Sequence, residues 1–126
     1  MKQQILIVDD ELEQLEFASA VLEDEYVTLT AKDGNEGLRI AREQKPDLIL
    51  LDIMMPEKGG IGMYQDLKRH EGTRDIPVVV VTGVTRGGGF DAHMLTQESE
   101  LPAPDGYVEK PMNPDELNRV IKTLLS

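Results

Sequence analysis

The chain contains short apolar runs that each end at a polar residue. Residues 5–8, 48–51 and 78–81 consist only of Val, Ile and Leu. Runs of this length without polar alternation are typical of strands buried on both faces, and therefore of a parallel sheet. With Asp47 and Pro77 opening the third and fourth strands, residues 26–30 and 107–109 are predicted as two more.

Amphipathic helices are predicted between these strands. The first begins at Asp10 or Glu11, whose acidic side chains suit the positive end of a helix dipole. Its apolar positions recur at helical spacing. They are Leu12, Leu15, Ala18, Val21 and Leu22.

Two more helices are delimited by glycine and proline. A turn is predicted at residues 33–35, before a helix over residues 36–44 that Pro46 ends. A further helix is predicted over residues 61–70, where Gly72 stops it. Their expected packing residues are Leu38, Ala41, Met63, Tyr64 and Leu67.

The last helix has a strong start signal. Asn113 is the predicted N-cap, Pro114 takes the first helical position, and two acids fill the first turn. An apolar stripe follows. It comprises Leu117, Val120, Ile121, Leu124 and Leu125. Since the sequence stops with this helix, no output domain is expected.

Strands that alternate with helices predict a doubly wound α/β fold with five strands and helices on both faces of the sheet. Residues 86–104 occupy the place of the fourth helix. They contain three consecutive glycines and two prolines, and a short helix is conceivable only at residues 90–99. We therefore expect a long, loose connection there.

Length and composition restrict the class of protein. The 126 residues suffice for one domain with one core, predicted over residues 1–126. The absence of cysteine excludes disulfides, thiolate metal sites and thiol nucleophiles. No stretch approaches the ~20 apolar residues of a membrane span, and the N-terminus does not resemble a signal peptide. We therefore expect a cytoplasmic protein.

The charge balance is acidic. Thirteen basic and 24 acidic residues give a net charge of −11, which argues against direct binding of nucleic acid. Most acidic side chains are expected to be solvated and to aid solubility. This group includes Glu11, Glu13, Glu16, Glu23, Asp24 and Glu25.

The polar residues that follow the strands are predicted to converge. Ligands bind beyond the carboxyl ends of an open parallel sheet, which brings together Asp9, Asp10, Asp52, Thr82 and Lys110. Three close carboxylates repel one another unless a cation joins them, and their oxygens suit Mg²⁺ or Mn²⁺, or Ca²⁺ with more ligands. Each residue alone is more often a cap, a turn or a surface residue. Only their co-occurrence indicates a site.

This set of groups suits phosphoryl transfer. Mg²⁺ usually combines one or two carboxylates with phosphate oxygens. The Lys110 ammonium, paired with Asp52 at rest, and the Thr82 hydroxyl can hold phosphoryl oxygens. Asp52 is the predicted nucleophile because it stands alone after a central strand, whereas the adjacent Asp9 and Asp10 are better placed as metal ligands.

Four local motifs occur in an order and spacing that belong together. They are Asp9-Asp10, the segment from Asp52 to Pro56 with Gly60 after it, Thr82-Gly83, and the segment from Tyr107 to Pro111. With these motifs the chain resembles the receiver domain of two-component response regulators over essentially its whole length. The resemblance implies a stand-alone, CheY-like domain with a flavodoxin-like fold and the strand order 2-1-3-4-5.

The resemblance implies roles for the matching residues. Asp52 would accept phosphate from a sensor histidine kinase or a histidine phosphotransfer protein, and the signal would pass to a downstream protein. Asp10 would bind Mg²⁺ directly, Asp9 mainly through water, and the backbone carbonyl of Met54 would be another ligand. Neither nucleic acid nor a membrane is expected as a direct partner, and the protein would be a monomer or a weak dimer.

The resemblance also implies a conformational switch. Thr82 and Lys110 would contact the phosphoryl group, and Tyr107 would turn inward as Thr82 moves. The peptide bond between Lys110 and Pro111 is expected to be cis, a form essentially confined to proline.

Three features depart from the family pattern. The segment between Thr82 and Lys110 is long, which blurs the surface that the family uses for signalling and dimerisation. Gly59 stands where an Asp is common. Met54 and Val84 are apolar at positions that tune the phosphate lifetime, so slow self-dephosphorylation is expected.

Three other functions are conceivable. A phosphatase of the haloacid dehalogenase type needs a general acid two positions after its nucleophile, where this chain has Met54, which cannot transfer a proton. A degenerate receiver that never takes phosphate would not need the full set of polar residues. A nucleotide site at residues 59–62 would lack a preceding strand and the P-loop lysine. The preferred function is a signalling switch that catalyses only its own phosphorylation and dephosphorylation.

Overall fold

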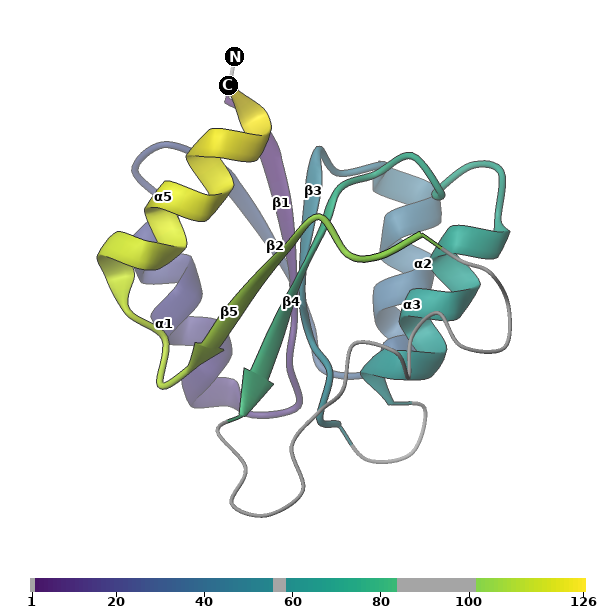
Figure 1. The fold of residues 1–126 in the computed structure, drawn as a ribbon, viewed down its shortest axis with the longest axis horizontal. Helices are drawn as coiled ribbons and strands as arrows, with labels where there is room; N and C mark the ends of the chain where they lie inside the picture. Colours follow the sequence, from purple (N-terminus) through teal and green to yellow (C-terminus); the bar gives the residue numbers. More distant parts are fainter. Residues whose placement is uncertain (1, 56–58, 84–101) are drawn as a thin grey trace.

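The apolar runs of the sequence form the centre of a parallel sheet. The computed structural model describes residues 2–55, 59–83 and 102–126, in which five strands pair in parallel in the order β2-β1-β3-β4-β5 (Figure 1). The strands are β1 (Gln4–Val8), β2 (Val27–Ala31), β3 (Leu48–Asp52), β4 (Val78–Gly83) and β5 (Gly106–Lys110). The predicted architecture and strand order are confirmed.

Burial separates the central strands from the edge strands. Every residue of β3 is buried, as are residues 5–8 of β1 and 78–81 of β4. The edge strands β2 and β5 expose part of their side chains. The continuous apolar runs therefore correspond to strands that are covered on both faces.

Helices cover both faces of the sheet (Figure 1). α1 (Leu12–Leu22) and α5 (Pro114–Leu125) pack on one face, and α2 (Gly34–Gln44) and α3 (Gly60–Arg69) pack on the other. Each face has its own apolar core. The predicted helical residues buried there include Leu15, Leu22, Leu38, Met63, Tyr64, Leu67, Leu117 and Ile121. No described helix is long and apolar enough to cross a membrane.

The start of α5 is the predicted one. The Asn113 side chain accepts hydrogen bonds from the backbone N–H groups of Asp115 and Glu116 at 2.9 and 3.1 Å. Pro114 takes the first helical position, where its missing N–H costs nothing.

The turn predicted at residues 33–35 is wrong. Gly34 and Asn35 lie in the first turn of α2, because the Asp33 side chain accepts the Glu36 N–H at 2.8 Å and starts the helix there.

The helix predicted over residues 61–70 starts and ends one residue earlier than expected. α3 ends at Arg69, and His70 is extended. The helix has therefore ended before Gly72, and the Thr73 hydroxyl, just after Gly72, donates to the Leu67 carbonyl in the last helical turn at 2.7 Å.

Three strands begin one residue later than predicted, and one of them is β4, which begins at Val78 rather than Pro77. β2 begins at Val27 rather than Tyr26, and β3 begins at Leu48 rather than Asp47. Asp47 lies just before β3, and its side chain accepts the N–H of Gln4 at 2.7 Å. The predicted short helix at residues 90–99 lies outside the described residues.

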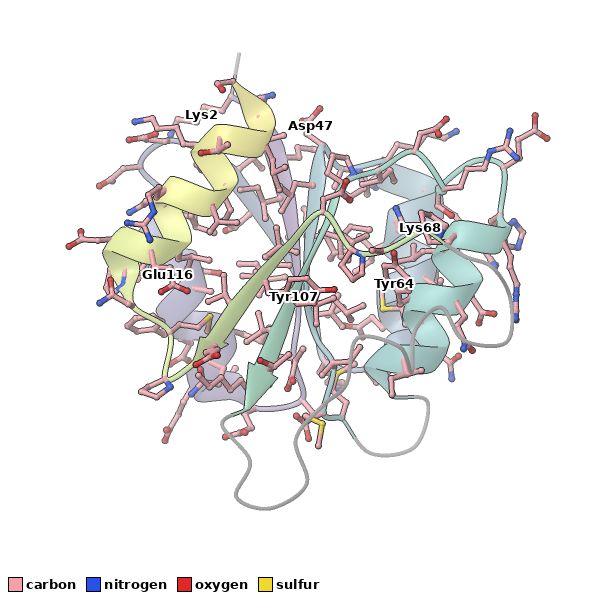
Figure 2. All side chains as sticks on the ribbon, in the orientation of Figure 1. Lys2, Asp47, Tyr64, Lys68, Tyr107 and Glu116 are labelled. Carbon is pink, nitrogen blue, oxygen red and sulfur yellow. The ribbon has the colours of Figure 1, made fainter. Side chains whose placement is uncertain are left out.

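Tyr64 and Lys68 of α3 (Figure 2) form hydrogen bonds with the segments that precede β5 and β4. The fully buried Tyr64 donates its hydroxyl to the Pro102 carbonyl, just before β5. The buried Lys68 ammonium donates to the carbonyls of Arg74 and Ile76, at 3.1 and 3.0 Å, in the connection to β4. These bonds fix the entrances of β4 and β5 against α3.

Candidate functional site

The strand register brings the polar residues to one edge of the sheet. Val8 of β1 aligns with Leu51 of β3, so Asp9 and Asp52, which follow them, are neighbours. β5 is parallel to these strands, and its last residue, Lys110, reaches the same edge.

Three carboxylates meet at this edge. Oxygens of Asp9, Asp10 and Asp52 all lie within 4.8 Å of one another. Asp9 and Asp52 are buried, whereas Asp10 is exposed. Two of the three negative charges are therefore shielded from water and depend on nearby groups for stabilisation.

Lys110 supplies the opposite charge. Its ammonium nitrogen lies 3.1 Å from Oδ2 of Asp9 and 3.1 Å from Oδ2 of Asp52. Burial tends to lower the pKa of Lys110, but the charges and hydrogen bonds of Asp52 and Asp9 outweigh it, so the pKa is raised. Lys110 therefore carries its full charge at neutral pH.

The environment of Asp9 disfavours its ionised form. Burial, reinforced by the charge of Asp52, raises the pKa of Asp9 from 3.8 to about 6. The Glu11 N–H, which donates to Asp9 Oδ1 at 2.9 Å, and Lys110 both act in the opposite direction. Keeping Asp9 ionised therefore has an energetic cost that a nearby cation would relieve.

Both oxygens of Asp52 have partners. The Met54 N–H donates to Oδ1 at 2.9 Å, and Lys110 donates to Oδ2 at 3.1 Å. These bonds fix the orientation of the carboxylate at the end of the fully buried β3.

Gly60 allows α3 to approach the backbone beneath this carboxylate. A Cβ at this position would overlap the Asp52 carbonyl oxygen and Ile53 Cα. Only glycine fits such a close approach without moving the backbone. The start of α3 therefore abuts the backbone of the residue that ends β3.

Thr82 lies on β4, directly beside β3 and Asp52, and Tyr107 lies on the edge strand β5, one strand further away. Tyr107 aligns with Val80, two residues before Thr82, so the three side chains point to the same face of the sheet. Thr82 is half-buried, and Tyr107 is 42% exposed. Tyr107 is thus in an outward position, with Thr82 further along the neighbouring strand.

Two other predicted features lie at this edge. The Lys110–Pro111 peptide bond is cis, as expected. The Met54 side chain is 52% exposed beside Asp52. Val84 lies outside the described residues.

The donor set fits a hard divalent cation. The three residues whose oxygens group together offer carboxylates only, with no nitrogen or sulfur donor. Carboxylate oxygens are the ligands that Mg²⁺ and Mn²⁺ prefer. Burial, and to a lesser degree the charge of Asp52, raises the pKa of Asp9, and a bound cation would favour its ionised form.

Glu11 was not expected at the site. Its carboxylate lies 3.9 Å from the Lys110 ammonium, although the side chain is largely exposed. Its residue type alone does not distinguish it from the solvated acids of the neighbouring α1. Its position directly after Asp9-Asp10 is the feature that brings it there.

Residues 5–122 of the chain match a known family, the response regulator receiver domain. The chain belongs to this family. The receiver domain is the phosphoryl-accepting part of two-component signalling systems, and in this chain Asp9, Asp10, Asp52 and Lys110 lie together at one edge of the sheet, with Thr82 near the end of β4.

Relatives support this assignment. The polar-differentiation response regulator DivK of Brucella anthropi is 33% identical over 126 residues, which cover 99% of this receiver domain and 98% of DivK. The probable transcriptional regulator ycf27 of Cyanophora paradoxa is 38% identical over 129 residues, which cover 98% of this chain and 48% of ycf27. The chain therefore spans about half the length of ycf27 and nearly all of DivK.

Solved structures share the fold. The receiver domain of a signal transduction histidine kinase from Syntrophus aciditrophicus has a TM-score of 0.81 at 32% identity, covering 98% of this chain and 89% of that one. The chemotaxis protein CheY4 of Vibrio cholerae has a TM-score of 0.84 at 24% identity, covering 99% and 100%, and this likeness concerns the fold alone.

Proposed function

We propose that Asp52 is the phosphoacceptor of this receiver domain and takes its phosphoryl group from a phosphohistidine. The donor is a sensor histidine kinase or a histidine phosphotransfer protein, and phosphorylation changes docking to a downstream protein. One observation carries the proposal. The buried Asp52 carboxylate lies 3.1 Å from the Lys110 ammonium and within 4.8 Å of the carboxylate oxygens of Asp9 and Asp10.

Asp9, Asp10 and Asp52, with the backbone carbonyl of Met54, would hold Mg²⁺. When bound, this ion neutralises negative charge on the carboxylates and on the phosphoryl oxygens. The exposed Asp10 can turn freely toward a cation. Asp9 already accepts from the Glu11 N–H and from Lys110, which suits an indirect contact through water.

Asp52 acts as the nucleophile. Its oxygen attacks phosphorus, the bond from phosphorus to the histidine nitrogen breaks, and the electron pair stays on that nitrogen. The Lys110 ammonium and the Thr82 hydroxyl each bind a phosphoryl oxygen and stabilise the charge that spreads over it. The Met54 N–H, which already holds Asp52 Oδ1, keeps the carboxyl group oriented.

The switch would involve Thr82 and Tyr107. A hydroxyl drawn toward the phosphoryl group vacates space on the face of the sheet that both side chains share. Tyr107, exposed on an edge strand, can turn into that space and alter the surface of β5. A change of this kind converts a local charge into a different docking surface.

The phosphorylated form should be long-lived. Met54, beside Asp52, carries no group that could orient an attacking water, and this supports slow self-dephosphorylation. The same residue stands where a haloacid dehalogenase type phosphatase needs its general acid. The domain therefore catalyses only its own modification and is not a turnover enzyme.

The direct test is intact mass after incubation with Mg²⁺ and acetyl phosphate. The wild type should gain one phosphate, Asp52→Asn should gain none, and the exposed control Asp24→Asn should behave like the wild type. A wild type that gains nothing would indicate a degenerate receiver. Continuous release of inorganic phosphate over many turnovers would indicate a phosphatase.

A further inference from the structure

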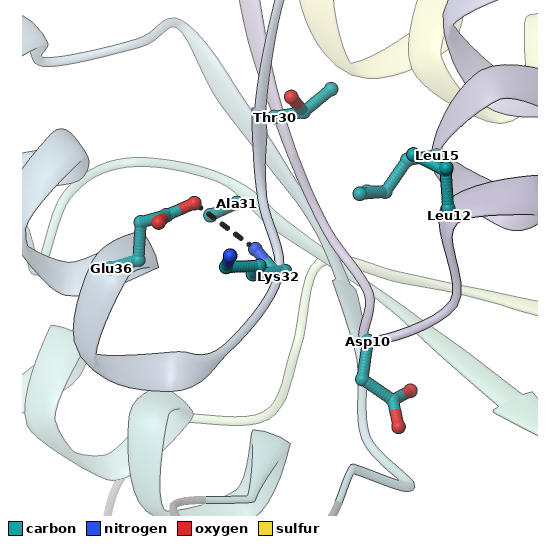
Figure 3. Close-up of a pocket in the computed structure, with 7 residues that line it drawn as sticks. All are labelled: Asp10, Leu12, Leu15, Thr30, Ala31, Lys32 and Glu36. Atoms are coloured by element: carbon teal, nitrogen blue, oxygen red, sulfur yellow. Dashed lines mark hydrogen bonds between the residues drawn. The ribbon is translucent and has the colours of Figure 1, made fainter.

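A hollow lies beside the acidic cluster, between the start of α1, the end of β2 and the start of α2 (Figure 3). Its volume is about 440 Å³, within the range of small-molecule sites. Asp10 lines it and also belongs to the carboxylate cluster. The hollow therefore adjoins the proposed phosphorylation site without containing Asp52.

One wall of the hollow is apolar. Leu12 and Leu15 of α1 form it, and Lys32 and Glu36 line the hollow on the side of α2 (Figure 3). The Leu12 side chain is 68% exposed, although the helical pattern predicted that it would be buried. A ligand that covered Leu12 would remove this apolar surface from water, which favours binding.

The wall on the side of α2 carries one charge of each sign. The Glu36 carboxylate accepts the Lys32 N–H at 3.2 Å through Oε1, which fixes its position and leaves its second oxygen for another donor. Among the described residues, the Lys32 ammonium makes no ion pair. The wall therefore offers an acceptor for a cation next to a donor for an anion.

We infer that this hollow binds a free α-amino acid with an aliphatic side chain. Its ammonium pairs with Glu36, its carboxylate pairs with Lys32, and its side chain covers the exposed Leu12. A simple anion would face the charges of Glu36 and Asp10, and a simple cation would face Lys32. A zwitterion offers a partner to both Glu36 and Lys32, and an apolar substituent covers the exposed Leu12.

The inference does not depend on phosphorylation, and its test uses binding alone. L-Leucine, titrated up to about 10 mM into the ¹⁵N-labelled full chain, should shift the amide signals of Leu12, Lys32 and Glu36 in NMR spectra. Two analogues each lack one charge: isopentylamine has no carboxylate, and 4-methylpentanoate has no ammonium. Each should bind about tenfold more weakly than leucine, since each leaves one charged partner unused.

Three variants complete the test. Lys32→Gln and Leu12→Ser should each weaken leucine binding by about tenfold. Arg42→Gln, which makes the same charge change on α2 away from the hollow, should bind leucine like the wild type. All three change exposed side chains, and their NMR spectra report whether each remains folded.

Three results would each overturn the inference. The first is the absence of any shift at these amides with leucine. The second is equal affinity for leucine and for either single-charge analogue, which would show that binding does not need both charges of the ligand. The third is equal weakening of leucine binding by Arg42→Gln and Lys32→Gln, which would show that only the net charge of the protein matters and not the position of Lys32.

Discussion

The Lys110 ammonium lies 3.1 Å from Oδ2 of Asp52. The same nitrogen lies 3.1 Å from Oδ2 of Asp9, so one cation from β5 joins two buried carboxylates from β3 and β1. Without a metal ion, Lys110 is the main group that offsets their mutual repulsion.

Replacement of Lys110 should therefore destabilise the metal-free protein. In Lys110→Met, Asp9 and Asp52 lose their shared partner, and we expect the free energy of unfolding to fall by about 2 kcal/mol, less than for a fully buried pair because Lys110 is partly exposed. Urea denaturation with EDTA at neutral pH measures this. Lys122→Met is the matched control, because its ion pair with Glu25 is exposed. Equal losses in the two variants would contradict the assigned role of Lys110.

The raised pKa of Asp9 predicts a specific pH dependence. Below its ordinary pKa of 3.8, Asp9 is protonated in both folded and unfolded chains and has no effect. As the pH rises from there through about 6, the folded chain binds this proton more tightly than the unfolded chain does, so the free energy of unfolding falls. Above that range the buried charge costs on the order of 2–3 kcal/mol.

Asp9→Asn removes this cost. We expect the variant to be more stable than the wild type at about pH 8, and the difference to disappear near about pH 4. The measurement is urea denaturation across this range with EDTA present, taken as the difference between the two proteins. A difference that stays constant with pH would show that Asp9 does not titrate as described.

Gly60 should not tolerate a side chain. In Gly60→Ala the added Cβ overlaps the backbone of Asp52 and Ile53, and backbone atoms cannot move aside as a flexible side chain can. We expect a loss of about 3 kcal/mol in unfolding free energy and slower phosphorylation of Asp52. Gly72→Ala is the control, since the nearest atom to its Cβ would be Lys45 Nζ at 3.8 Å. An unchanged Gly60→Ala protein would contradict the close approach of α3.

Asn113 should contribute as a helix cap. Its side chain accepts two backbone N–H groups at the start of α5, and Asn113→Ala leaves both to water, at a cost of about 1 kcal/mol in thermal or urea unfolding. Asn118→Ala, inside the same helix, should be neutral or slightly stabilising, because alanine is the better helix former. If both changes have the same effect, Asn113 does not act as the cap.

The sequence predicted the sheet well because the central strands leave no alternative. An apolar run such as residues 48–51 can be buried only between two helical layers, and parallel strands then bring their polar ends to one edge. The same logic anticipated the convergence of Asp9, Asp10, Asp52 and Lys110. These predictions rest on patterns that burial imposes.

The wrong predictions concern places where a single side chain determines the local structure. Asp33 starts α2 by accepting one hydrogen bond, from the Glu36 N–H. Residues 33–35 are of types that are common in turns, so the sequence predicted a turn where the helix begins. Leu12 fits the helical pattern of α1 but lies at its first turn, beyond the cover of the sheet. The proximity of Glu11 to Lys110 and the overlap that requires Gly60 depend on tertiary approach, which no local pattern records.

The strand β5 places two different groups three residues apart. Lys110 ends the strand among the carboxylates, and Tyr107 lies near its beginning with its side chain partly exposed. Three residues of extended chain span about 10 Å. A change in what Lys110 binds would therefore act on the same short strand that bears the Tyr107 side chain, at the edge of the sheet.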